Sequence, residues 1–159
     1  MTDCQIFDGI VDLKGRKHRF PVAEGSEWCQ VRPIKVRNHP AFTTITKEAK
    51  MLVAIHDIPK DTIIGYYAGT MVKDEDVTTR TWSPYCLEAT TNSKYLVDAG
   101  KIGNNVRYIN HYENIDEKPN VIFLTADFRL GGFAVVQVQT LIDIAAGTEL
   151  LADYGKDYW

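Results

Sequence analysis

Two short stretches carry the side chains with the clearest capacity for chemistry. Residues 103–111, GNNVRYINH, place Asn110 and His111 at the end of a short apolar run. Residues 148–159, TELLADYGKDYW, place Tyr154 between an acid and a glycine, and two further aromatic residues follow. An amide, an imidazole and a phenol can hydrogen-bond to a polar ligand and orient it. Neither stretch has the spacing of a metal site, a nucleotide loop or a nucleophile elbow.

Each of these residues also has an ordinary structural interpretation. The chain contains eight tyrosines, and a tyrosine in a β-rich domain usually packs in a core or an interface. An Asn-His pair commonly closes a turn. Arg107 is expected to form an internal ion pair, with Asp98 as a candidate partner. The residues therefore gain a functional meaning only from their common order along the chain.

Length and composition favour one intracellular domain. The 159 residues are enough to enclose a core, and the net charge of −3 argues against a nucleic-acid partner, which would need a basic face. Cys4, Cys29 and Cys86 are odd in number and form no CxxC pair, which predicts free thiols in a reducing compartment. We find no apolar run long enough to span a membrane and no signal-peptide pattern, so we expect no membrane partner.

The elements that must position the candidate residues are predicted to be short strands. Residues 51–55 and 62–68 are β-rich runs on either side of a turn that contains Pro59. Residues 121–128 and 132–142 predict a hairpin that turns at 129–131. A second predicted hairpin joins residues 85–89 to 94–98, and residues 27–37 around Pro33 resemble an edge strand.

Two further patterns concern helix content and internal repetition. Residues 73–80, KDEDVTTR, are the best candidate for a short helix because acids occupy the first turn. Residues 53–64 and 139–151 share one design, in which an apolar strand, Asp-Ile, a turn, Thr and a second apolar strand follow one another. Many short strands and little helix predict a mostly β fold.

In their order, these motifs resemble the SET domain, a family of S-adenosylmethionine-dependent protein-lysine methyltransferases. The resemblance covers roughly residues 51–159. It is carried by the segments LVAIHDIPKDTIIGYYAGT (52–70), YCL (85–87), YLVDA (95–99), RYINH (107–111) and ELLADYG (149–155). It implies a fold of several small sheets with a threaded, pseudoknot-like C-terminal segment that joins the Asn-His and Tyr motifs into one site.

The same resemblance implies the role of each site residue. Tyr154 would be the catalytic tyrosine, and Tyr67, Ala152 and Tyr154 would line the channel for the substrate lysine. Asn110 and His111 would bind the amino-acid and adenine ends of S-adenosylmethionine. The complete set of implied cofactor-binding residues is Lys50, Met51, Tyr85, Asn110, His111, Tyr158 and Trp159. No metal is expected.

The chemistry suits these residue types. A lysine amine attacks the methyl group of a sulfonium, and a protonated lysine, with a reference pKa of about 10.4, has no lone pair for that attack. An apolar, aromatic channel disfavours the charged amine and helps to release its proton. A tyrosine with a reference pKa of about 10 is a poor general base at neutral pH, so an orienting role is expected for Tyr154.

The sequence departs from the family pattern in three places. Residues 49–51, Ala-Lys-Met, stand where the family carries Gly-x-Gly beside the cofactor. The Ser-Cys after Asn110-His111 is replaced by a longer loop at 112–118, and no Cys-rich tail follows residue 155, so no post-SET zinc site is expected. We accordingly predict a flanking region at 1–47 that packs on a SET domain at 48–159.

Three interpretations follow, from different classes. The first is a protein-lysine N-methyltransferase that uses S-adenosylmethionine, releases S-adenosylhomocysteine and acts on a protein or peptide, with a histone tail as the first substrate to test. The protein would then be nuclear, or cytoplasmic if its substrate is not a histone. The second is a non-catalytic SET-like or PR-like module that binds a peptide or protein, which the altered Gly-x-Gly favours. The third is a generic β-domain with chance matches.

Overall fold

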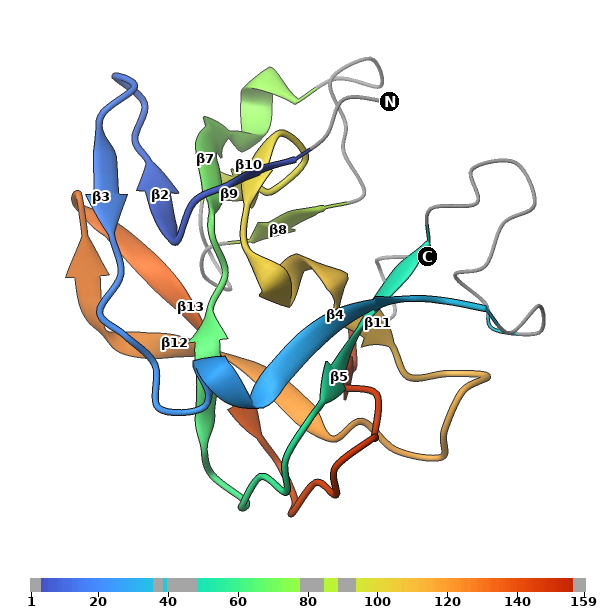
Figure 1. Cartoon of the computed structure of the whole chain (residues 1–159). Coiled ribbons are helices and arrows are strands. Elements are labelled where there is room, and N and C mark those ends of the chain that lie inside the picture. The colour runs from blue at the N-terminus through green and yellow to red at the C-terminus, as the bar shows by residue number, and fades with distance from the viewer. Residues whose placement is uncertain (1–3, 36–38, 40–48, 78–84, 89–93, 156–159) are drawn as a thin grey trace. The chain divides into compact units, whose positions relative to one another are not determined.

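A computed structural model describes residues 4–35, 39, 49–77, 85–88 and 94–155 (Figure 1). These residues form short strands and single-turn 3-10 helices, which confirms the predicted mostly β fold. The strands are β1 (Gln5–Ile6), β2 (Gly9–Val11), β3 (Lys17–Arg19), β4 (Cys29–Pro33), β5 (Lys50–Ala54), β6 (Ile63–Tyr66), β7 (Gly69–Lys73), β8 (Cys86–Glu88), β9 (Tyr95–Asp98), β10 (Ile102–Gly103), β11 (Asn110–His111), β12 (Val121–Leu130), β13 (Phe133–Thr140) and β14 (Leu151–Ala152). The 3-10 helices are η1 (Ser26–Trp28), η2 (Asp74–Asp76) and η3 (Asn105–Tyr108).

The chain divides into two compact units, which are described one at a time. Unit 1 comprises Met1–Ala23, Gly65–Arg107 and Leu124–Gln137. Unit 2 comprises Glu24–Ile64, Tyr108–Phe123 and Val138–Trp159. The predicted packing of residues 1–47 on a core at 48–159 stays a prediction.

A five-stranded sheet in the order β3-β2-β7-β9-β8 forms the frame of unit 1. Its β8 and β9 strands pair antiparallel from Cys86 opposite Asp98 to Glu88 opposite Leu96, as predicted for this hairpin. The predicted helix at 73–80 is represented by the three-residue η2 alone, and residues 78–80 lie outside the described part. Acids in the first turn are thus compatible with a single 3-10 turn as well as with a helix.

The long β12–β13 hairpin is the clearest element that the sequence predicts (Figure 1, orange). Its turn is Gly131-Gly132, with φ angles of 58° and 84°. Positive φ at both central residues is the geometry whose twist matches the flanking strands, and glycine adopts it without strain. Strand β12 therefore extends two residues closer to the turn than the predicted 121–128, whereas β13 starts one residue later and ends two residues earlier than the predicted 132–142.

Unit 2 contains the antiparallel β4–β5 pair, which runs from Cys29 opposite Ala54 to Pro33 opposite Lys50. Pro33 is tolerated because it lies at the end of an edge strand, as predicted. Leu52, Ala54 and Leu150 are fully buried and supply part of the core of this unit.

The two repeated segments of unit 2 contact each other reciprocally. Ile58 and Ile144 exchange both backbone hydrogen bonds, at 2.7 and 2.8 Å between nitrogen and oxygen. Asp57 Oδ1 accepts from the amide of Ala146 at 2.9 Å, and Asp143 Oδ1 accepts from the amide of Lys60 at 2.8 Å. Each aspartate of the shared Asp-Ile pair thus caps the turn of the other segment. The predicted common design is confirmed as an approximate twofold arrangement.

We expect Asp57→Ala and Asp143→Ala to destabilise the protein to a similar extent. Each loses one hydrogen bond to a carboxylate, and because both side chains are exposed we expect about 1 kcal/mol for each variant. Urea unfolding followed by fluorescence measures this change. His56→Ala removes an exposed neighbour and should change stability by less than about 0.5 kcal/mol. Equal stability of all three variants would show that the reciprocal contacts contribute nothing.

All three cysteines are free thiols. Burial raises the pKa of the Cys29 thiol to about 12, so this side chain stays protonated and behaves as a small apolar residue. Within the described ranges, no group of His, Cys, Asp and Glu has the arrangement of a metal site. No helix in the same part of the chain is long and apolar enough to cross a membrane.

Candidate active site

The Asn-His motif and the C-terminal motif meet in unit 2 as a parallel strand pair. In this pair Asn110 is the partner of Leu151, and His111 is the partner of Ala152. The amide of Tyr112 continues the ladder with a bond of 3.0 Å to the carbonyl of Ala152. The two stretches that carry the candidate chemistry are therefore held side by side by backbone hydrogen bonds.

Tyr154 is hydrogen-bonded to the Asn-His segment through both its backbone amide and its side-chain hydroxyl. Its amide donates to Nδ1 of His111 at 3.0 Å, and its hydroxyl donates to the carbonyl of Ile109. The rings of His111 and Tyr154 lie 5.4 Å apart between centroids. Because the proton of the phenol points at Ile109, the lone pairs of its oxygen are directed elsewhere. The arrangement orients a tyrosine hydroxyl as an acceptor.

His111 is buried and its imidazole is held in one tautomer. Since Nδ1 accepts the Tyr154 amide proton, the proton of the neutral ring resides on Nε2. Nε2 lies 3.6 Å from Oε1 of Glu113, whose side chain is largely exposed. The imidazole thus holds the backbone of Tyr154 in place through this hydrogen bond. This supporting role is additional to the adenine contact that the family resemblance implies for His111.

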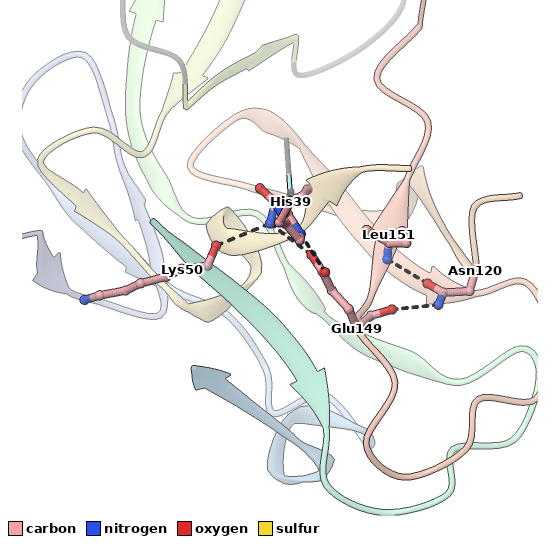
Figure 2. A network of polar contacts seen from close by, with 6 residues as sticks. His39, Lys50, Asn120, Glu149 and Leu151 are labelled. Atoms are coloured by element: carbon pink, nitrogen blue, oxygen red, sulfur yellow. Dashed lines mark hydrogen bonds and ion pairs between the residues drawn. The ribbon is translucent and has the colours of Figure 1, made fainter. Parts of the chain in front are cut away.

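Asn110 contacts Lys50 and Glu149, which belong with His39 to a network of polar contacts (Figure 2). The Nδ2 group of Asn110 donates to the carbonyl of Lys50 at 3.3 Å and to Oε2 of Glu149 at 3.0 Å. His39 Nε2 lies 2.8 Å from the other carboxylate oxygen, Oε1. The side chains of His39 and Glu149 are only 8% and 12% exposed, so this network is mostly shielded from water.

Asn120 holds the strand that leads to Tyr154. Its side chain donates to the carbonyl of Glu149 at 2.9 Å and accepts from the amide of Leu151 at 2.7 Å, as Figure 2 shows. Its own amide donates to the carbonyl of Leu151 at 2.9 Å. Asn120 is buried, and it therefore satisfies backbone groups that would otherwise be buried without partners.

The segment that replaces Gly-x-Gly begins strand β5. Ile34 donates to the carbonyl of Ala49 at 2.9 Å, so the next residue, Lys50, directs its carbonyl away from β4 and toward Asn110. The Lys50 ammonium lies 5.5 Å from the centre of the Tyr108 ring, a cation-π contact. Met51 is half-buried. The Lys50 side chain is thus exposed, while the Lys50 carbonyl contacts Asn110.

The described residues fit an amino-acid nucleoside such as S-adenosylmethionine in their donor and acceptor types. The carboxamide of Asn110, on β11, contacts the backbone carbonyl of Lys50, at the start of β5. Ala152 is completely buried and lies in register with His111. This combination of few polar groups among buried apolar residues is typical of small-molecule sites.

The remaining sequence-predicted residues are placed as follows. Tyr67 and Tyr85 belong to unit 1, where the Tyr67 hydroxyl donates to the carbonyl of Tyr85 at 2.6 Å. The Arg107 guanidinium lies 4.0 Å from the centre of the Tyr85 ring and donates to the carbonyls of Ala99 and Gly100. Asp98, the partner expected for Arg107, accepts from the amide of Gly100. Tyr158 and Trp159 lie outside the described residues.

Sequence reasoning missed the contributions of His39, Asn120 and Glu149 to this site. Glu149 is part of the ELLADYG segment, but the resemblance assigns it no role, and nothing in the local sequence marks His39 or Asn120. The one available signal was chemical, since a glutamate within an apolar strand requires partners when it is buried. Nothing in the spacing indicates that a histidine 110 residues earlier in the chain supplies one.

The site and fold define a class of protein in which a small parallel strand pair joins an Asn-His pair to a segment that leads to a tyrosine. The family model of the SET domain matches residues 50–155. The chain belongs to the SET domain family.

Similar proteins agree with this assignment. The histone-lysine N-methyltransferases EHMT1 of Mus musculus and Homo sapiens are each 29% identical over 109 residues, which cover 67% of this chain and 8% of the relative. The chain therefore matches only a small part of the length of these curated relatives.

Solved structures share the fold. An active polycomb repressive complex 2 in the basal state matches with a TM-score of 0.62 and 21% identity over 80% of this chain and 15% of that chain. A ctPRC2 in an autoinhibited conformation bound to S-adenosylmethionine matches with a TM-score of 0.61 and 19% identity, again over 80% of this chain and 15% of that chain. The SET fold is confirmed by these matches.

Proposed function

We propose that this chain is an S-adenosylmethionine-dependent protein-lysine N-methyltransferase with Tyr154 as its catalytic residue. The observation that carries the proposal is the double attachment of Tyr154 to the Asn-His segment, through the His111 imidazole and the Ile109 carbonyl. Membership of the SET family and the name of the EHMT1 relatives support the reaction class. The proposal includes S-adenosylhomocysteine as product and no metal.

Different residues of unit 2 have different roles in this reaction. S-adenosylmethionine, when bound, would supply the methyl group of its sulfonium to a neutral lysine amine, with the thioether S-adenosylhomocysteine as the leaving group. Tyr154 offers an oriented oxygen acceptor that aligns the amine and favours positive charge near the transferring methyl. Asn110 and His111 would hold the cofactor, together with the backbone of Lys50 and Met51. Positioning of this kind can supply several kcal/mol of the barrier reduction.

A histone tail is the first substrate to test, because the curated relatives are named histone-lysine methyltransferases. A histone substrate implies a nuclear, chromatin-associated role. A substrate other than a histone implies a cytoplasmic role. A radiolabelled methyl-transfer assay on a histone mixture, with a Tyr154→Phe control, tests the reaction class. Incorporation that is lost in the control supports the proposal, and equal incorporation by both proteins contradicts it.

Ala152 leads to a prediction about the number of methyl groups added. The family often carries a phenylalanine or tyrosine at this position, and the small side chain in this chain leaves room for a methylated amine. We expect di- or trimethylated product from the wild type and a shift toward monomethyl product in Ala152→Tyr. Mass spectrometry after long incubation measures both distributions.

The Ala152→Tyr experiment needs a check of folding and a control variant. Ala152 is completely buried, so a tyrosine there is expected to cost about 1–3 kcal/mol of stability, and thermal unfolding must first show that the variant folds. Ala152→Ser keeps the small volume and should keep the wild-type product pattern. A wild type that stops at monomethyl-lysine would contradict the role of Ala152.

A non-catalytic binding module is the second candidate, and residues 49–51 favour it. Ala49 and Met51 stand at the positions where the family has the two glycines whose backbone lies close to its cofactor. This candidate predicts that the folded wild type binds a peptide or protein but does not bind S-adenosylmethionine.

A further inference from the structure

His39 lies outside the residues that match the SET family, yet it contacts the polar network of the site. Its Nε2 approaches Oε1 of Glu149 to 2.8 Å, and its side chain is 8% exposed. Residues 50–155 carry the family match, so His39 is a contribution of the preceding segment. Both His39 and Glu149 belong to unit 2.

Glu149 uses its two carboxylate oxygens for two different partners. Oε1 forms a hydrogen bond with Nε2 of His39, and Oε2 accepts a hydrogen bond from the Nδ2 group of Asn110 at 3.0 Å. An ionised carboxylate only accepts hydrogen bonds, so Nε2 of His39 carries the proton of this contact. A hydrogen bond to a charged and largely buried acceptor is stronger than a neutral one on the surface. His39 therefore restricts the rotation of the Glu149 side chain.

The network also decides which way the Asn110 carboxamide points. Both groups near its nitrogen, the Lys50 carbonyl and the Glu149 carboxylate, are acceptors. Only the NH₂ end of the amide can satisfy them, and a flipped amide would place oxygen against oxygen. Oδ1 of Asn110 is thereby turned to the opposite side, where it can accept a proton from a ligand.

We propose that His39 is a positioning residue, which acts through Glu149 to fix the Asn110 carboxamide so that Oδ1 receives the ammonium group of the cofactor's amino-acid end. This inference rests on the proposed function, since it assigns S-adenosylmethionine to the site. It adds a residue from outside the family match to the machinery that selects the amino-acid end of the ligand.

The test compares two ligands that differ at that end. S-adenosylhomocysteine carries the ammonium and carboxylate groups, and 5′-deoxy-5′-methylthioadenosine keeps the adenosine and the thioether but lacks both groups. We expect His39→Leu to weaken binding of S-adenosylhomocysteine about tenfold, with binding of methylthioadenosine within about twofold of the wild type. In His39→Gln, a side-chain NH₂ can still donate to Glu149, so this variant should restore most of the preference. Isothermal titration calorimetry measures all six affinities.

A purely structural role for His39 predicts a different result. Both ligands would then lose affinity by the same factor in His39→Leu, and His39→Gln would show no selective recovery. Equal affinities of wild type and His39→Leu for S-adenosylhomocysteine would also overturn the proposal.

A second measurement needs no ligand. In protein labelled with ¹⁵N-asparagine, the side-chain amide signals of Asn110 can be assigned by their loss in Asn110→Ala. We expect their exchange with water to be about tenfold faster in His39→Leu than in the wild type or His39→Gln. Unchanged exchange would refute the positioning of Asn110 by His39. A wild type that binds neither nucleoside would refute the proposed cofactor, whatever the exchange rates show.

Discussion

Tyr154→Phe is expected to lower the rate of methyl transfer by about 10²–10³-fold while leaving S-adenosylhomocysteine binding nearly unchanged, because removal of one oriented polar group from a reaction centre typically has this effect. The phenol oxygen is lost, but the ring remains against His111, and the backbone amide still donates to the His111 imidazole. The single-turnover rate and the calorimetric affinity for the product, measured on the same preparation, separate chemistry from binding.

A matched control exists in the neighbouring tyrosine. Tyr112→Phe removes a hydroxyl from a ring whose centroid lies 4.9 Å from that of His111. We expect this variant to keep a rate within about threefold of the wild type, as for a substitution that spares the reacting atoms. If Tyr112→Phe were as slow as Tyr154→Phe, or if Tyr154→Phe were fully active, Tyr154 would not be the catalytic residue.

Asn120→Ala is expected to produce the largest loss of stability, about 2–5 kcal/mol, because each buried group left without a partner costs about 1–3 kcal/mol. The variant removes the acceptor for the Leu151 amide and the donor for the Glu149 carbonyl. Since these bonds hold the strand before Tyr154, we expect the cofactor affinity to fall as well. Denaturant unfolding, with the midpoint and slope both fitted, measures the effect.

An exposed asparagine supplies the comparison for that experiment. Asn105→Ala should change stability by less than about 0.5 kcal/mol, because its side chain is exposed. A similarly small change in Asn120→Ala would show that the bonds to Glu149 and Leu151 do not hold the strand.

The parts of the fold that the sequence predicts are those whose signals are local. The β12–β13 hairpin follows from two β-rich runs and a glycine pair, whose positive φ angles the turn requires. The common design of 53–64 and 139–151 is visible because Asp-Ile recurs at the same place, and the reciprocal bonds of Asp57 and Asp143 explain that recurrence. In these cases neighbouring residues decide the structure.

The parts that local patterns miss depend on distant partners. The β11–β14 pair is two residues long and joins Asn110 to Leu151, so no periodicity marks it, and only the family resemblance indicated the meeting of these motifs. The contact between His39 and Glu149 spans 110 residues and follows from no spacing rule. At residues 73–80, acids in a first turn predicted a helix, but three residues of 3-10 structure are enough to accommodate Asp74–Asp76.

Calorimetric titration of the wild type and of Asn110→Ala with S-adenosylmethionine and S-adenosylhomocysteine tests the central claim most directly. We predict clear binding of both ligands by the wild type and a loss of at least about tenfold in Asn110→Ala, which removes the carboxamide that Lys50 and Glu149 orient. Wild-type protein that is folded and binds neither ligand, even with a basic peptide present, would contradict the methyltransferase assignment and favour the binding module.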